Sequence, residues 1–354
     1  MNRFTRTIII FGATAFVNAV ATLPASAQDV SYKGKTVTLI INSAAGGGTD
    51  LTNRMIGNHL AKYLPGSPQV VFRNIAGGGG LKANNYFANQ VPPDGLTFLG
   101  GSRTQISPTK VRAPQVKYDP AKYAFIGGDA NLGSIMVVNR KAVARLTDPS
   151  APPVVYGDFD GTRSGILLSL WTKETANWNL RWVVGYAGQA ALSMAVQGGE
   201  LDAMANQNEA RIKPMVAGEF VAVAQIGVRD DSGQIVRRRT FPDVPLFSEI
   251  ILPKLDGPAR QAFLNMYADF LVNKWIALPP GTPDSHVATY RAAYQKVVVD
   301  PEFRKFAEGD MGAEYTPLSG EQIQAIVADL AATSDADIAY VKALSKKYGV
   351  QQVD

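Results

Sequence analysis

The sequence predicts an α/β fold built from two successive series of strands and helices. Short runs rich in β-branched residues alternate with helical stretches, a pattern that favours mixed layers over a β-sandwich or a helical bundle. The chain has 354 residues, which is enough to bury the cores of two lobes. It shows no internal repeat at a fixed short period, so we do not expect a solenoid.

The first series begins with a buried strand at residues 36–42, a nearly continuous apolar run. Apolar residues then recur at the helical period, at Leu51, Met55 and Tyr63. The same order of strand and helix follows again. We therefore expect strands over residues 36–42, 69–73 and 96–100, and helices over residues 50–64 and 79–90.

The second series follows Tyr118 and ends in a helical C-terminal part. We expect strands over residues 136–139, 154–157, 181–184, 201–204 and 221–226, and helices over residues 162–175, 189–197 and 209–217. A Pro- and Gly-rich loop at residues 279–283 precedes a helix over residues 284–299, and an amphipathic pattern predicts one helix over residues 321–347.

Residues 1–27 have the features of a cleavable signal peptide. Arg3 and Arg6 precede an apolar stretch at residues 8–20, and the segment ends in Ala25, Ser26 and Ala27, a small-x-small cleavage pattern. The alternative is a retained anchor, but the apolar stretch is short for a bilayer core of about 30 Å. We expect cleavage before Gln28 and export of the mature chain.

Composition narrows the class of function. The chain has no cysteine, which excludes a disulfide framework and a thiol nucleophile. Its net charge is +5, and loss of two arginines with the signal peptide leaves an excess of three. Basic residues are scattered and not interleaved with aromatic ones, so we expect no nucleic-acid partner.

The strongest local pattern is a glycine-rich loop between the first strand and the first helix. Glycines allow close approach of the backbone to a ligand, and the start of a helix offers unpaired N–H groups and a dipole that favours an anion. Plain capping of the helix by Thr49 or Asp50 is the alternative. The candidate ligand-binding residues in this loop are Ser43, Ala44, Gly46, Gly47, Gly48, Thr49 and Asp50.

A second glycine loop follows the second strand and repeats the arrangement, with Gly77, Gly78 and Gly79 as candidates. Two such loops at the same edge of a parallel sheet direct their N–H groups into a common crevice, which suits a carboxylate. A nucleotide site is disfavoured, because neither a GxxxxGK[ST] nor a GxGxxG motif is present.

Beyond these loops, the chain resembles the substrate-binding proteins of tripartite tricarboxylate transporters, also called the Bug family. The similarity is carried by residues 35–64 and 70–102, and by the later runs GGELDAMANQ, TFPDVPLFSEI, WIALPPGTP and DPEFRKFAEGDMGAEYTPLS. The resemblance implies a two-lobed periplasmic binding protein fold with a ligand cleft between the lobes. It places residues 28–131 plus 269–354 in lobe 1 and residues 132–268 in lobe 2.

The resemblance also implies the partners and the site. We expect a periplasmic monomer that binds a small carboxylate, a di- or tricarboxylate or an aromatic acid, for membrane transporter subunits, without a cofactor or metal. The third strand is followed by Ser102 and Arg103, and the turn in the second lobe carries Thr162, Arg163 and Ser164. Both arginines depart from the small polar residues usual in the family, and each is either a partner for a carboxylate or an exposed loop residue.

Further site candidates are Tyr186, where the family's Tyr-Lys-Gly landmark has lost its lysine, and Asn206. About a dozen residues around positions 253–270 exceed the usual family length and predict an additional helix on the second lobe.

Two other functions remain open at this stage. A periplasmic sensor that presents its ligand to a receptor would use the same pocket. An enzyme is less favoured, because the chain has only two histidines, His59 and His286, without a recognisable nucleophile or metal partner. A hydrolase that uses carboxylates alone stays possible, but we predict no catalytic residue.

Overall fold

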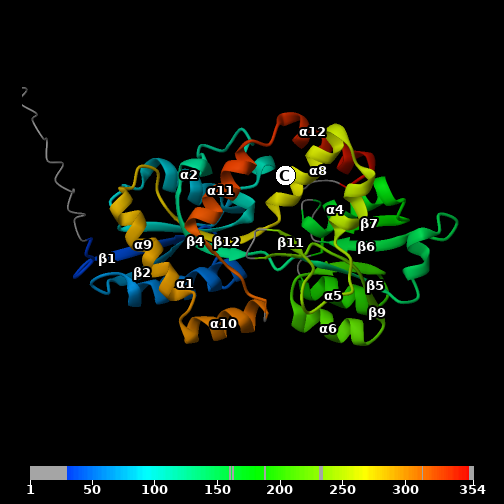
Figure 1. The fold of residues 1–354 in the computed structure, drawn as a ribbon, viewed down its shortest axis with the longest axis horizontal. Helices are drawn as coiled ribbons and strands as arrows, with labels where there is room; N and C mark the ends of the chain where they lie inside the picture. Colours follow the sequence, from blue (N-terminus) through cyan, green and yellow to red (C-terminus); the bar gives the residue numbers. More distant parts are fainter. Residues whose placement is uncertain are drawn as a thin grey trace, which may run out of the picture.

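The computed structural model describes residues 30–158, 161, 163–186, 189–230, 234–312 and 314–350. The expected signal peptide at residues 1–27 lies outside them. Figure 1 shows two α/β lobes side by side, with strands β4 and β12 running toward the junction between them. None of the helices in the described part of the chain is long and apolar enough to cross a membrane.

The first lobe is built on a six-stranded sheet with the order β13-β4-β12-β3-β1-β2. Its strands are β1 (Thr36–Ile41), β2 (Gln69–Asn74), β3 (Thr97–Ser102), β4 (Ala124–Ala130), β12 (Val272–Leu278) and β13 (Pro317–Ser319). β1 is parallel to β2 and β3, whereas β12 is antiparallel to β3 and β4. The carboxyl ends of the first three strands therefore meet at one edge, where the glycine loops begin.

The second lobe contains a five-stranded sheet with the order β7-β6-β8-β5-β9. Its strands are β5 (Ile135–Asn139), β6 (Val154–Asp158), β7 (Leu180–Val184), β8 (Ala203–Asn206) and β9 (Phe220–Gln225). β6 is parallel to β7 and β8, and β5 is antiparallel to β8 and β9. A short hairpin of β10 (Val228–Arg229) and β11 (Ile235–Val236) follows.

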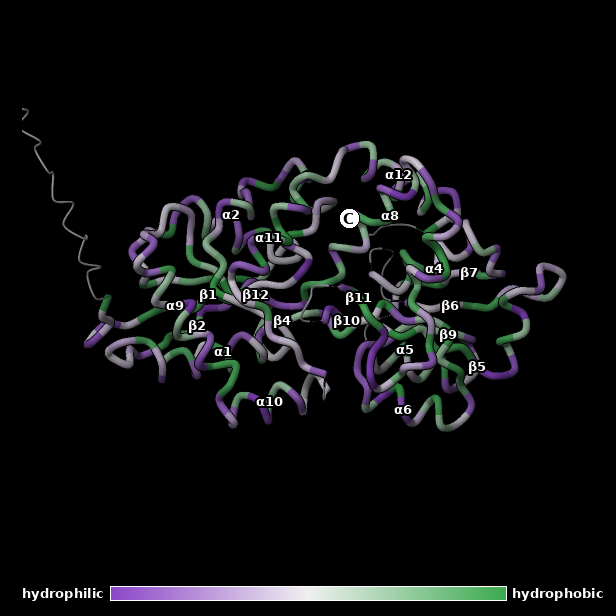
Figure 2. Tube along the Cα trace, viewed as in Figure 1, coloured by the Kyte–Doolittle hydropathy of each residue, from purple (hydrophilic) through white to green (hydrophobic). Residues whose placement is uncertain are grey.

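Helices cover both faces of the first sheet. They are α1 (Gly48–Tyr63), α2 (Leu81–Gln90), α3 (Pro108–Val111), α9 (Asp284–Val297), α10 (Pro301–Met311) and α11 (Gly320–Ala331). One core contains Leu39, Phe98 and Tyr290, and the core on the other face contains Phe125 and Trp275. In Figure 2 hydrophobic segments gather in the interior of each lobe, for example along β6 and β9.

Helices also cover the second sheet, and the last two of them along the chain were harder to predict from the sequence. The set is α4 (Ser164–Ala176), α5 (Gln189–Gln197), α6 (Glu209–Ala217), α7 (Phe247–Ile251), α8 (Gly257–Asp269) and α12 (Asp335–Lys347). α8 is formed by the segment that exceeds the usual family length. Its Phe263 and Tyr340 of α12 lie on Trp171 of α4, each with ring centroids 5.4 Å apart.

The C-terminal part differs from the single helix expected over residues 321–347. The helix is broken after Ala331, and α12 restarts with a capping box in which the Ser334 hydroxyl accepts a hydrogen bond from the Asp337 N–H at 3.1 Å. α12 crosses to the second lobe, because Val341 and Leu344 belong to the core that contains Trp171. The expected division of the chain assigned residues 269–354 to the first lobe, and those domain limits stay a prediction.

Candidate functional site

A cleft of about 430 Å³ lies between the two lobes. This volume suits a small organic molecule. The first lobe contributes Gly48 and Thr52 of α1 and Asn273 and Lys274 of β12. The segment that joins β4 to β5 contributes Leu132 and Ser134, and the second lobe contributes Asp158, Arg163, Ser164, Gly165, Ala205, Asn206, Gln207, Asn208 and Arg211. We refer to these residues as the cleft lining.

Three helices begin at the cleft without a side-chain cap. The N-cap residues of α1, α4 and α6 are Gly47, Arg163 and Asn208, and none of them caps its helix with a side-chain hydrogen bond. The N–H groups of a first helical turn lack partners within the helix, and the dipole adds partial positive charge at that end. Convergence of three helix starts on one cleft favours an anionic ligand.

A glycine lies at two of these helix starts, Gly48 in α1 and Gly165 in α4. A Cβ atom on Gly165 would lie 2.4 Å from the Tyr156 hydroxyl and 2.6 Å from the Ala205 Cβ, so only glycine lets α4 begin this close to the sheet. A Cβ atom on Gly48 would meet nothing within 4 Å. The backbone at the start of α1 therefore faces open space, where a ligand can approach it.

The charged side chains of the cleft lining are mainly basic. Arg163, Arg211 and Lys274 outnumber the single acid, Asp158. The Arg163 Nε atom lies 3.3 Å from the buried Asp158 carboxylate, and Lys274 donates a hydrogen bond of 2.9 Å to the side-chain oxygen of Asn273. The excess of two positive charges favours a ligand with more than one negative charge.

Asn206 adds a neutral donor at the end of β8. Its side chain is buried, and its Oδ1 accepts a hydrogen bond of 2.8 Å from the N–H of Asn208. Its buried Nδ2 has no hydrogen-bond partner among the described residues. A buried amide donor without a partner costs free energy, and a bound acceptor would remove that cost.

A buried ion pair between the lobes supports the second-lobe side of the cleft. Arg238 is fully buried and donates to Glu314 at 2.8 Å and to the carbonyl of Gln207 at 3.0 Å. Burial raises the pKa of Glu314, but Arg238 and neighbouring donors outweigh burial and lower it below its usual value. The pair fixes the backbone between β8 and α6, next to the Asn206 side chain.

The first glycine loop is held by Asp50, which the sequence suggested as a ligand residue. The buried Asp50 carboxylate accepts from the N–H of Gly46 at 2.9 Å, from Arg54 at 2.9 Å and from Asn74 at 2.7 Å. Burial raises its pKa, but these three donors outweigh burial and lower it. Its oxygens are occupied inside the protein, and an ionised carboxylate repels an anion, so its geometry fits support of the loop rather than contact with the ligand.

The other residues of this loop lie next to the cleft. Gly48 belongs to the cleft lining, whereas Ser43, Ala44, Gly46, Gly47 and Thr49 are not among the described residues that line it. The Ser43 hydroxyl donates to the carbonyl of Ala44 at 3.3 Å.

The second glycine loop packs against the end of β3 instead of lining the cleft. Gly77, Gly78 and Gly79 all have positive φ, a conformation that favours glycine. The carbonyl of Gly79 accepts a hydrogen bond of 2.5 Å from Gln105, whose side-chain oxygen accepts from the N–H of Ser102 at 2.9 Å. These contacts join the second glycine loop to the end of β3, and none of these residues is among the described residues of the cleft lining.

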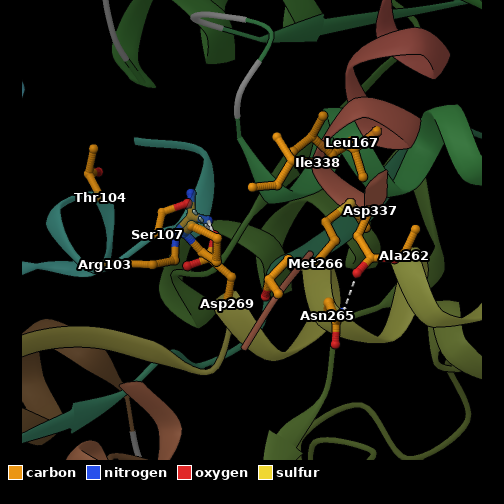
Figure 3. Close-up of a pocket in the computed structure, with 13 residues that line it drawn as sticks. Arg103, Thr104, Ser107, Leu167, Ala262, Asn265, Met266, Asp269, Asp337 and Ile338 are labelled. Carbon is orange, nitrogen blue, oxygen red and sulfur yellow. Dashed lines mark hydrogen bonds and ion pairs between the residues drawn. The ribbon is translucent and has the colours of Figure 1, made fainter. Parts of the chain in front are cut away.

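Arg103 and Tyr186 also have partners away from the cleft. Arg103 forms an ion pair of 2.7 Å with Asp269 and lines a separate small cavity, shown in Figure 3. Tyr186 donates to Glu200 at 2.6 Å, and burial together with this acceptor raises the pKa of Tyr186 to about 12. Thr162 lies outside the described residues. Of the predicted site residues, the structure thus brings Gly48, Arg163, Ser164 and Asn206 together in the cleft lining.

Sequence reasoning missed two of the three basic residues at the cleft. Lys274 lies on β12, where it pairs in register with Ser102 of β3 and Asp129 of β4. Arg211 lies in the first turn of α6, three residues after the N-cap. The only available signal was position, because Lys274 directly precedes the WIALPPGTP run and Arg211 shortly follows Asn206.

The described cleft lining suits binding better than covalent chemistry. Thr52, Ser134 and Ser164 supply hydroxyl groups, but the described lining contains no histidine that could activate one as a nucleophile. Its donors are amides, guanidinium groups, an ammonium group and helix N–H groups, which bind carboxylate oxygens.

The comparisons with known proteins agree with this geometry. No family model matches the chain. A UPF0065 protein of Bordetella pertussis is 25% identical over 328 residues, which cover 86% of this chain and 88% of the relative.

Three solved structures share the fold. A TctC solute-binding protein from Polaromonas is 20% identical with a TM-score of 0.65 and covers 90% of this chain and 100% of its own. The periplasmic binding protein BugD is 21% identical with a TM-score of 0.57 (90% and 99% covered), and an R. palustris protein with adipate is 20% identical with a TM-score of 0.59 (90% and 98% covered). The chain therefore has the fold of the TctC and Bug solute-binding proteins and is a relative of a UPF0065 protein along most of its length, which confirms the resemblance found in its sequence.

Proposed function

We propose that this chain is an exported solute-binding protein that captures a small organic dicarboxylate in the cleft and delivers it to a tripartite tricarboxylate transporter. The ligand leaves chemically unchanged. This proposal rests on one observation. The cleft has an excess of basic residues, and three helices begin there without side-chain caps. The similarity to a solved protein with adipate, a dicarboxylate, supports the same ligand class.

The arrangement of donors favours two acidic groups on the ligand. The start of α1 and Lys274 belong to the first lobe, and Arg163, Arg211 and Asn206 belong to the second. A dicarboxylate placed across the cleft thus meets donors at both of its ends. A monocarboxylate would leave one set of donors without an acceptor, which costs binding free energy.

Calorimetric titration of the chain from Gln28 onward tests the ligand class. The ligands are adipate, succinate, citrate and benzoate, with hexanoate as the monoacid matched to adipate and 1,6-hexanediamine as the cation of the same length. We expect at least one diacid to bind ten times or more tighter than its monoacid, a difference of about 1.4 kcal/mol. Equal binding of adipate, hexanoate and the diamine would refute the anion site.

Export and delivery have separate tests. N-terminal sequencing of protein recovered from the periplasm should give Gln28 as the first residue, and size-exclusion chromatography with light scattering should give a monomer.

Uptake of the bound diacid should stop when the gene for this chain is deleted and return when it is restored. Normal uptake in the deletion strain would favour a sensor that presents the ligand to a receptor.

A further inference from the structure

A histidine and two carboxylates meet where α1 packs against the start of α10. The His59 Nε2 atom lies 3.7 Å from Asp300 Oδ1 and 3.5 Å from Glu302 Oε2. One ligand atom from each residue lies within 4.8 Å of the others. His59 and Asp300 are buried, whereas the Glu302 side chain is 72% exposed. The cluster therefore opens to solvent on one side only.

The imidazole of His59 has the orientation that metal-binding histidines adopt. Its Nδ1 lies 2.9 Å from the carbonyl oxygen of Met55, and because a carbonyl only accepts, Nδ1 carries the proton and donates it. This contact leaves Nε2 directed at the two carboxylates. Nε2 is buried without a hydrogen-bond partner among the described residues. Metal-binding histidines almost always donate their other ring N–H to a carbonyl or a carboxylate, so this contact fits a metal-binding role for Nε2.

We propose that His59, Asp300 and Glu302 bind a divalent transition-metal cation of the zinc type. In a tetrahedral zinc site with bonds of about 2.0 to 2.2 Å, neighbouring ligand atoms are roughly 3.3 to 3.6 Å apart. The two separations measured from Nε2 are close to that range. The two carboxylate oxygens lie within 4.8 Å of each other, so the side chains must move closer together to complete the geometry. Water fills the remaining position on the open side.

The present partners of the carboxylates define what a metal must displace. Lys62 Nζ lies 2.6 Å from Glu302 Oε2 and 3.8 Å from Asp300 Oδ2. Asp300 also accepts from Tyr63 at 2.8 Å and caps α10 through the N–H groups of Glu302 and Phe303. The Lys62 side chain is 47% exposed, so its ammonium group can turn to water when a cation of higher charge replaces it.

The metal would stabilise the first lobe rather than contact the solute. His59 follows Gly48 by eleven residues, which corresponds to about 16 Å along the axis of α1. A cation there joins α1 to α10 at the end of α1 that lies away from the cleft. The proposal is therefore independent of the proposed function.

Zinc titration of the chelator-treated mature chain, prepared without a polyhistidine tag, tests the site. We expect one Zn²⁺ per chain, a rise in Tm with Zn²⁺, and at least a tenfold loss of affinity in His59→Gln and Glu302→Gln. Glu302→Gln is the safer variant, because this exposed side chain contributes little to the core. The matched control is Glu308→Gln on the same helix, also partly exposed and paired with Arg304, which should bind Zn²⁺ like the parent.

Two further measurements identify the ligand atoms. Lys62→Ala removes the competing cation and should raise Zn²⁺ affinity severalfold. Because the chain has only two histidines, imidazole ¹⁵N spectra assign the response to one ring. Zn²⁺ should shift Nε2 of His59 and leave His286 unchanged. Binding within twofold of the parent in both His59→Gln and Glu302→Gln, or a response of His286 alone, would overturn the proposal.

Discussion

Two spaces lie between the lobes, and they differ in how their polar groups are paired. In the smaller cavity, of about 60 Å³, Asp269 accepts from Arg103 at 2.7 Å and from Ser107 at 3.0 Å, and Asn265 donates to Asp337 at 2.9 Å. Figure 3 shows these two groups facing each other across the cavity. In the cleft, by contrast, three helices begin without a side-chain cap and the Asn206 amide keeps an unused donor.

The contrast shows that a polar residue at a lobe edge serves the fold or the ligand according to its partner. Arg103 and Arg163 both come after the end of a strand, so the sequence alone predicted the same role for both. Arg103 pairs with a carboxylate of α8 and packs over the Phe270 ring, with 5.0 Å from its guanidinium carbon to the centroid. Arg163 pairs with Asp158 inside the cleft lining. We propose that the first arginine supports the fold and that the second, which lines the cleft, contacts the ligand.

The largest effect is expected on stability, from Arg103→Ala. Its removal leaves the buried Asp269 carboxylate without its cation and removes the contact with the Phe270 ring. We expect the free energy of unfolding to fall by about 3 kcal/mol, measured by urea denaturation. Affinity for the best diacid should stay within twofold of the parent. A thirtyfold loss of affinity with unchanged stability would place Arg103 in the ligand site instead.

Arg163→Ala should produce the reverse pattern. The substitution removes a donor from the cleft and leaves Asp158 uncompensated beside the bound anion. We expect affinity for the best diacid to fall about thirtyfold, or 2 kcal/mol, in calorimetric titration. The loss of stability should be smaller than in Arg103→Ala, because the Arg163 side chain is 49% exposed and lies 3.3 Å from the Asp158 carboxylate, against 2.7 Å between Arg103 and Asp269. Arg181→Ala, an exposed arginine on β7, is the control and should bind like the parent.

Gly48→Ala examines the helix start that faces the cleft. A Cβ atom there meets nothing within 4 Å, so the methyl group fits the free protein but occupies space that the ligand needs. We expect a loss of affinity of about tenfold. The gain in stability should be small, because Gly48 is the first residue of α1 and helix propensity acts mainly in the interior of a helix. Gly309→Ala in α10, also free of contacts, should give the gain in stability without the loss of affinity. Unchanged affinity in Gly48→Ala would remove the start of α1 from the site.

The sequence predicted the layers of the molecule better than its long-range contacts. The first strands and helices follow local periodicity, so β1, α1 and β2 lie within a few residues of their expected ranges. The break between α11 and α12 was missed because the apolar pattern continues past it. The transfer of α12 to the second lobe depends on stacking of Tyr340 on Trp171, a contact between residues far apart in the chain.

The same distinction applies to the candidate site. Gly48 and Ser164 begin helices, Arg163 directly precedes α4, and Asn206 ends β8, so all four lie where the sequence indicates the end of a strand or the start of a helix. Lys274 reaches the cleft only because β12 inserts between β3 and β4 with a register that no local pattern specifies. Asp50 was interpreted as a ligand residue because the sequence does not show its hydrogen bond with Asn74, which lies 24 positions away along the chain.

The smallest expected effect is a pH dependence that separates two buried carboxylates, Asp269 of the small cavity and Asp50 behind the first glycine loop. Burial raises the pKa of Asp269 above its usual value of 3.8 despite Arg103 and Ser107, and its Oδ1 atom has no hydrogen-bond partner among the described residues. The folded protein therefore holds this proton more tightly than the unfolded chain. The stability that this proton contributes is present below about pH 4 and is lost as the pH rises through the folded-state pKa.

Urea denaturation of the parent and Asp269→Asn across this pH range measures that loss. Relative to the variant, the parent should lose stability as the pH rises. Asp50→Asn is the control of opposite sign, because the pKa of Asp50 is lowered in the folded protein. Relative to that variant, the parent should gain stability as the pH rises toward 4. A parent that gains stability with pH relative to both variants would show that Arg103 outweighs burial at Asp269, and that the small cavity holds a carboxylate as firmly ionised as the one behind the first glycine loop.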